Sequence, residues 1–151
     1  LNPFFEDILP VIRDSVIGES NTALIIPSLN SLRTLLQYSK NEASYGQNSE
    51  AILDIILSSL KNDHFSVKAE GLLATSSFTK VISSTGGDSV GKLNEVALSC
   101  MDASENAILA VSHILSNCHK ALSTSEISGD IDILTEKLSN DMKRVAALRA
   151  M

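Results

Sequence analysis

The sequence predicts an all-α protein built from paired helices, and three observations lead to this prediction. Apolar residues recur with the three- and four-residue spacing of a helix face, and no segment alternates apolar and polar residues as a strand would. Aromatic residues make up only 4% of the chain and tryptophan is absent, so aliphatic residues and alanine must fill the core, which suits packed helices better than sheets. Short polar segments separate the apolar ones.

The first two predicted helices cover residues 4–17 and 22–40. The first carries apolar residues at helical spacing, and Pro10 either kinks it or lies near its first turn. The segment 18–21, Gly-Glu-Ser-Asn, ends this helix and offers N-cap residues to the next. The second helix places leucines on one face.

The third and fourth predicted helices cover residues 49–61 and 65–82. A polar loop is expected before them at 41–49, so that Ser49 and Glu50 lie near the start of the third helix. An Asn-Asp-His segment separates the two helices.

A glycine-rich loop at 83–89 is expected before a fifth helix, 90–101, and a sixth, 105–122. A polar, acidic loop is expected at 123–130. The seventh and eighth predicted helices are 131–139 and 143–151.

The predicted helices occur in pairs with a period of about 40 residues, the length of two-helix repeats in stacked helical proteins. One pair cannot bury its own apolar face, whereas stacked pairs share a continuous core. We therefore expect about four stacked pairs in a single unit, residues 1–151, and we expect this unit to belong to a longer stack. The pairs cover roughly residues 3–40, 49–82, 90–122 and 131–151, and we expect the last to continue further.

Small residues in the second helix of each pair are expected to let adjacent layers of the stack approach closely. Gly71 and Ala74 are examples in the second pair. A glycine inside a helix costs about 1 kcal/mol relative to alanine, so a close approach to a neighbouring helix is a physical reason for Gly71.

Two of the predicted pairs resemble HEAT repeats, in which Asp or Asn in the turn within a pair precedes a Val-Arg or Val-Lys start of the second helix and then alanine-rich positions. The residues that carry the resemblance are Asn62, Asp63, Val67, Lys68 and Ala74 in one pair, and Asn140, Asp141, Lys143, Arg144, Ala146, Ala147 and Ala150 in the other. The first and third pairs have Leu24-Ile25 and Ile108-Leu109 there and lack the basic residue. The resemblance implies a right-handed α-α superhelix, a HEAT/ARM-like solenoid, that works as a non-enzymatic scaffold for protein–protein interaction.

Other helical architectures and partners stay open. A four-helix bundle of the vinculin or talin kind would imply a cytoskeletal adaptor. The segments ILAVSHILSNCHKAL and ILTEKLSNDMKRVAALRAM are similar to the cullin-associated (CAND) branch of HEAT proteins, which regulates the assembly of cullin-RING ubiquitin ligases. Karyopherin-type transport receptors and TOG-type microtubule binders belong to the same class, although TOG arrays usually place an aromatic residue in the first turn, where this chain has Gly-Glu-Ser-Asn.

Charge and cysteine content bear on partners and location. The net charge is -6 and the longest basic cluster is Lys143-Arg144, so nucleic-acid binding is not expected. Cys100 and Cys118 are too few for a disulfide framework, and we expect them to be reduced, apolar fillers in an intracellular protein of the cytoplasm or nucleus. No apolar run approaches the ~20 residues that span a bilayer.

The sequence predicts neither a metal site nor a catalytic one. The only metal-like set is Cys100, His113, Cys118 and His119, whose spacing on helices points the side chains in different directions. The sequence has no G-x-S-x-G motif and no phosphate-binding Gly-Lys-Ser/Thr, so we expect no cofactor and no small-molecule substrate. A hydrolase stays open only if a pocket brings His113 or His64 next to a Ser or Cys and an acid.

Charged residues on the surface supply the remaining candidates. Paired carboxylates such as Asp130 and Asp132 are expected to be solvated charges at a helix start. In a stack of pairs, basic residues near the turns would lie along one ridge and either bridge neighbouring Asp residues or bind an acidic partner protein. The residues with this predicted role are Lys61, Lys68, Lys143 and Arg144. The loops predicted at 41–49, 83–89 and 123–130 would add variable contacts.

Overall fold

The computed structural model describes residues 2–18, 20–38, 42–82, 87–102 and 104–150, and within these ranges every regular element is helical. The all-α prediction is therefore confirmed. The elements are α1 (Asn2–Ile17), α2 (Thr22–Tyr38), α3 (Glu42–Leu60), α4 (Phe65–Thr79), α5 (Gly87–Ser99), α6 (Asn106–Cys118), the short 3-10 helix η1 (His119–Ala121) and α7 (Thr124–Ala150).

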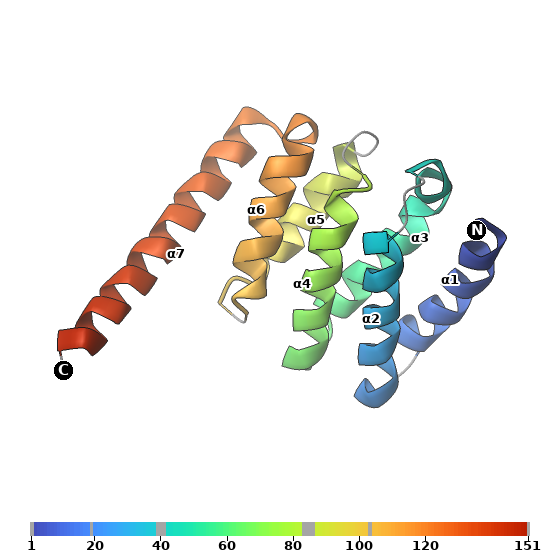
Figure 1. Ribbon diagram of the computed structural model, residues 1–151. Helices are drawn as coiled ribbons and strands as arrows, with labels where there is room; N and C mark the ends of the chain where they lie inside the picture. Colours follow the sequence, from blue (N-terminus) through green and yellow to red (C-terminus); the bar gives the residue numbers. More distant parts are fainter. Residues whose placement is uncertain (1, 19, 39–41, 83–86, 103, 151) are drawn as a thin grey trace.

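The first six helices pack in two layers (Figure 1). Helices α1, α3 and α5 form one layer, and α2, α4 and α6 form the other. Each helix of the first layer packs on the next helix along the chain, and the pairs contact one another within each layer. Helix α7 packs against α6 at the end of the stack.

The core between the layers is aliphatic, as the composition predicts. Its fully buried side chains include Leu29, Ile52, Ile56, Leu72 and Ile114, with Phe78 as the aromatic member. The two cysteines are free and buried, as expected of apolar fillers. Burial raises the pKa of the Cys118 thiol to about 11, so this thiol stays protonated at neutral pH.

Helix α3 begins earlier than the sequence predicts. The expected loop at 41–49 is wrong for residues 42–49, which form the first part of α3, while residue 41 lies outside the described residues. Ser49 and Glu50 accordingly lie inside the helix and not at its start. The segment contains Glu, Ala and Gln, which favour helices, and no proline, so its polarity does not end the helix.

Helix α7 replaces a predicted loop and two predicted helices. Residues 124–150 form one continuous helix, so the loop at 123–130 and the separate helices 131–139 and 143–151 are wrong. Ser123 and Glu126 start α7 with a capping box: the Glu126 carboxylate accepts the Ser123 N–H at 2.7 Å, and Ser123 Oγ accepts the Glu126 N–H at 3.3 Å. The helix then passes through Asn140 and Asp141 without a turn. The described chain thus has three helix pairs followed by a single helix.

Other boundaries differ by less. Pro10 lies in the interior of α1, away from its first turn. The predicted loop at 83–89 falls mostly outside the described residues, and its last residues belong to the start of α5. The sixth predicted helix ends at Cys118 and is followed by η1.

Gly71 makes a close approach, but within its own helix pair and not to an adjacent layer of the stack as expected. An added Cβ would overlap Ser59 Oγ and lie 3.1 Å from Ser59 Cβ and 3.2 Å from Leu60 Cδ2. Ser59 and Leu60 belong to α3, so the helix that requires the glycine is the first helix of the same pair. Gly71 lets α4 pack directly on the end of α3.

We predict that Gly71→Ala destabilises the protein by about 1–3 kcal/mol despite the gain in helix propensity, because the methyl group overpacks the α3–α4 contact. Gly129→Ala is the matched control, because an added Cβ at Gly129 meets nothing within 4 Å. We expect the control to be stabilised by about 0.5–1 kcal/mol. Urea denaturation measures both, and equal shifts in the two variants would contradict this account of the packing.

Candidate functional site

The helix pairs bring three turns to one edge of the protein. Helices α2, α4 and α6 run in the same direction, and they begin along the lower edge in Figure 1, where α7 also ends. Each of these helices has backbone N–H groups without helical partners in its first turn, and these carry partial positive charge. Because α1, α3, α5 and α7 end at this edge, positive partial charges at helix starts alternate along it with negative partial charges at helix ends.

A groove of about 560 Å³ lies at this edge. We call it the edge groove. Its lining includes Phe65 and Ala69 of α4, Asp102 and Glu105 of the α5–α6 connection, and Lys137, Asp141 and Arg144 of α7, so it carries three carboxylates and two cations. Asn106 Nδ2 donates to the Ala69 carbonyl at 3.4 Å and ties the start of α6 to α4.

One ion pair joins α7 to the α5–α6 connection, and a second lies within α7. Lys137 Nζ pairs with Asp102 Oδ1, and this hydrogen bond raises the pKa of Lys137. Arg144 Nη2 lies 3.2 Å from Asp141 Oδ1 within the same helix. Lys137 was not among the predicted site residues, because nothing in the sequence indicates that α7 crosses the α5–α6 connection.

The four basic residues predicted to bind a partner lie near the same edge but not on one line. Arg144 borders the edge groove. Lys68 is half-buried in the first turn of α4, and Lys61 is exposed in the turn before it. Lys143 is exposed and lies beside a different hollow of α7, bordered by Leu138 and Met142, because consecutive residues of a helix point about 100° apart.

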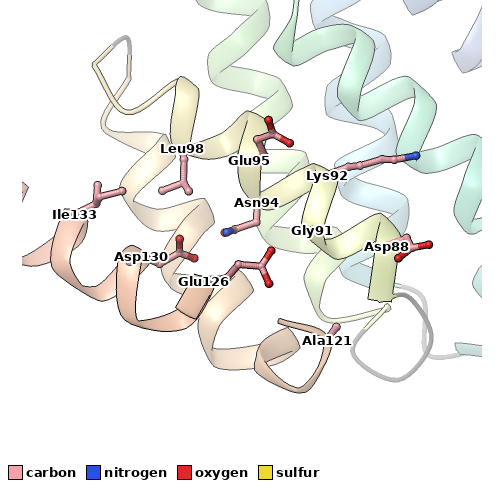
Figure 2. A pocket seen from close by; sticks show the side chains of 11 residues that line it. Asp88, Gly91, Lys92, Asn94, Glu95, Leu98, Ala121, Glu126, Asp130 and Ile133 are labelled. Carbon is pink, nitrogen blue, oxygen red and sulfur yellow. The ribbon is translucent and has the colours of Figure 1, made fainter. Parts of the chain in front are cut away.

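A second hollow, of about 740 Å³, separates α5 from the first half of α7 (Figure 2). Four carboxylates line it, from Asp88, Glu95, Glu126 and Asp130, together with Asn94 and Lys92. In Figure 2 the Lys92 side chain points away from Asp130 and Glu126. We call this feature the acidic hollow.

Asp130 is a correction to the sequence-based prediction. It was expected to be a solvated charge at a helix start, but it is only 2% exposed and lies inside α7, facing α5. Because α7 begins at Thr124, Asp130 lies within the helix, on the side that faces α5. Burial raises the pKa of Asp130 and the negative Glu126 adds to this rise, while a hydrogen bond from Asn94 opposes it. The Ser-x-x-Glu capping box at 123–126 was the signal that could have placed it.

The cysteines and histidines do not converge. Cys100 Sγ lies 3.9 Å from the Leu60 carbonyl, whereas Cys118 Sγ donates to the Thr79 carbonyl at 3.5 Å. Within the described ranges, no group of three His, Cys, Asp or Glu side chains is placed to hold a metal ion. Neither His64 nor His113 borders the edge groove or the acidic hollow.

Comparison of the chain with models of protein families, with curated proteins and with solved structures finds no match. Among the residues that the structure describes, no helix has the length and apolar character needed to cross a membrane.

We predict that Asp130→Asn raises stability at neutral pH, because a buried carboxylate with a raised pKa disfavours the folded state once it ionises. The folded wild-type protein holds this proton more tightly than the unfolded chain does. Relative to the variant, its stability should therefore fall as pH rises above the ordinary Asp value of 3.8 and level off above the raised pKa. Melting temperatures of both proteins at pH 3.5 and pH 7 measure the difference. A variant that is less stable than wild type at pH 7 would contradict the prediction.

Proposed function

We propose that this chain is a non-enzymatic scaffold that binds other proteins, and that its helix pairs stack in the manner of a HEAT-like solenoid. The fold supports the second part because contacts run mainly between successive pairs, and because the turns within the pairs lie along one edge. A helical-bundle adaptor is less consistent with this arrangement, since helices of a bundle enclose one shared core.

The observation that carries the binding proposal is an exposed apolar stripe on α7. Leu138, Met142, Val145 and Leu148 recur at helical spacing and are 45–73% exposed, and Ile131 extends the stripe at 50%. We call these five residues the α7 stripe. Scattered apolar residues are normal on surfaces, but a contiguous apolar face on one helix is typical of an interface with another protein.

The α7 stripe and the edge groove share helix α7, which contributes residues to both. Helix α7 supplies Lys137 and Arg144 to the groove and Leu138 and Met142 to the stripe. Figure 1 shows α7 diverging from α6 toward its C-terminal end. Apolar anchors beside the exposed basic side chain of Lys143 suit a partner segment that combines apolar and acidic residues.

The basic residues of this surface give the partner its charge preference. Within the described residues, Lys61, Lys68 and Lys143 form no salt bridge, whereas Arg144 is paired only with Asp141 of its own helix. Lys61 and Lys68 lie where α3 meets α4, whereas Lys143 and Arg144 lie near the end of α7. They are the candidates for contacts with acidic groups of the partner.

A second candidate within the same class is a regulator of cullin-RING ubiquitin ligase assembly. It is favoured by the resemblance of the segments around α6 and α7 to the CAND branch. That resemblance implies two helices where the structure has α7 alone, so we place it second. Karyopherin-type receptors and TOG-type microtubule binders differ from it in the partner that they would capture.

We predict that a double substitution in the α7 stripe, Leu138→Ser with Met142→Ser, weakens partner binding at least tenfold without lowering the melting temperature. Both side chains are mostly exposed, so removing them costs binding and not folding. The partner is first identified by capture with the full-length protein and mass spectrometry. Capture of a cullin would indicate the CAND-like regulator, transport cargo a karyopherin-type receptor, and tubulin a TOG-type microtubule binder. Its affinity for purified variants is then measured by calorimetry.

The matched control is Val11→Ser with Leu24→Ser, two exposed apolar residues on α1 and α2. The charge preference is tested in the same assay by Lys143→Glu with Arg144→Glu, against Lys80→Glu with Lys120→Glu near the opposite ends of α4 and α6. Partner affinity that is unchanged in the stripe variant, or equally reduced in its control, would refute the proposed surface.

A further inference from the structure

The acidic hollow holds two buried oxygen atoms that accept no hydrogen bond. Asp130 Oδ2 and Asn94 Oδ1 both have less than 1 Å² of exposed surface and no donor within the described residues. Their residues are 2% and 3% exposed and face each other from α7 and α5. A buried acceptor without a donor is unfavourable, because it has lost its hydrogen bonds to water.

The surroundings of these atoms add negative charge and no compensating cation. Glu126 uses Oε2 for the capping box with Ser123. Its other oxygen, Oε1, lies toward Gly91 of α5, 3.9 Å from the position of an added Cβ. Asp88, Lys92 and Glu95 are exposed at the rim of the hollow, and in Figure 2 the side chains of both Lys92 and Glu95 point away from Asp130.

We propose that the acidic hollow is a binding site for the guanidinium or ammonium group of a basic side chain from another protein. Such a group offers several N–H donors and a positive charge. It fits a hollow that combines the carboxylates of Glu126 and Asp130 with the amide oxygen of Asn94. A cluster of carboxylates alone would not indicate this ligand. The indication comes from Asp130 Oδ2 and Asn94 Oδ1, which are buried without a hydrogen-bond donor that the ligand would supply.

The site is separate from the surface proposed for partner binding. The acidic hollow lies between α5 and the first half of α7, whereas the edge groove and the α7 stripe involve the second half of α7. The two sites also prefer opposite charges. Failure of one proposal therefore leaves the other standing.

The test is a titration of the 151-residue chain with the tripeptide Ac-Gly-Arg-Gly-NH₂, followed by NMR amide shifts at low ionic strength. The matched probe is the citrulline peptide, which has nearly the same shape without the charge. We expect the arginine peptide to shift amides of residues 91–98 and 126–133, and to bind at least tenfold more tightly than the citrulline peptide. We also expect binding to weaken as salt is added, since the charges are screened.

The variant Asp130→Asn should lose at least tenfold in affinity for the arginine peptide, while Asp54→Asn, an exposed carboxylate on α3, should bind as wild type does. If Asp130→Asn fails to fold, Asp88→Asn with Glu95→Gln removes charge from the rim and should weaken binding severalfold. Equal binding of the two peptides, shifts spread over the whole surface, or an affinity unchanged in the hollow variants would each overturn the proposal.

Discussion

The structure depends on the burial of α4, which packs against α2, α3 and α6 at once. From Gly71 to Thr79 every residue except Leu73 is buried, so this part of the helix has no solvent face. Two of its buried polar residues are accommodated locally: Thr75 and Thr79 donate their hydroxyl hydrogens to backbone carbonyls of α4 at 2.8 Å. From α6, Asn106 and Asn117 donate to Ala69 and Thr79 and hold both ends of the α4–α6 contact. The neighbouring helices are positioned by this one element.

The opposite situation holds for α7, which is the least buried helix of the stack and carries both proposed sites. Asp130 is its one buried residue, and its contact with the body is made largely by polar side chains and partly buried apolar ones. The capping box stabilises the start of this helix. The Lys137–Asp102 pair and packing against α6 hold it against the rest of the protein. The exposed apolar residues of α7 and the buried carboxylate of Asp130 both raise the free energy of the isolated chain. Partners that cover or pair with these groups would lower it. Binding surfaces are expected where a stable core supports an element of this kind.

The sequence predicted the fold class and the core better than the ends of elements. Periodic aliphatic residues identified all the helices of the first three pairs, and Gly71 predicted a close helix contact. Polar segments are misassigned as loops because exposed polar residues such as Ser125, Glu126 and Ser128 occupy the solvent side of a helix and do not mark its end. The edge groove and the acidic hollow could not be predicted at all. Both depend on where α7 crosses α5 and α6, which is set by three-dimensional packing and leaves no local signal in residues such as Lys137 or Asp130.

The central claim is that α4 organises the stack, and native-state hydrogen exchange measured by NMR tests it most directly. We expect amides of α4 between Leu72 and Thr79 to exchange only through global unfolding, with opening free energies equal to the free energy of unfolding from denaturation. Amides of α1, which packs only at the end of the stack, should open at lower free energies. Exchange of α4 amides through local opening, with α1 amides better protected than they are, would contradict the account.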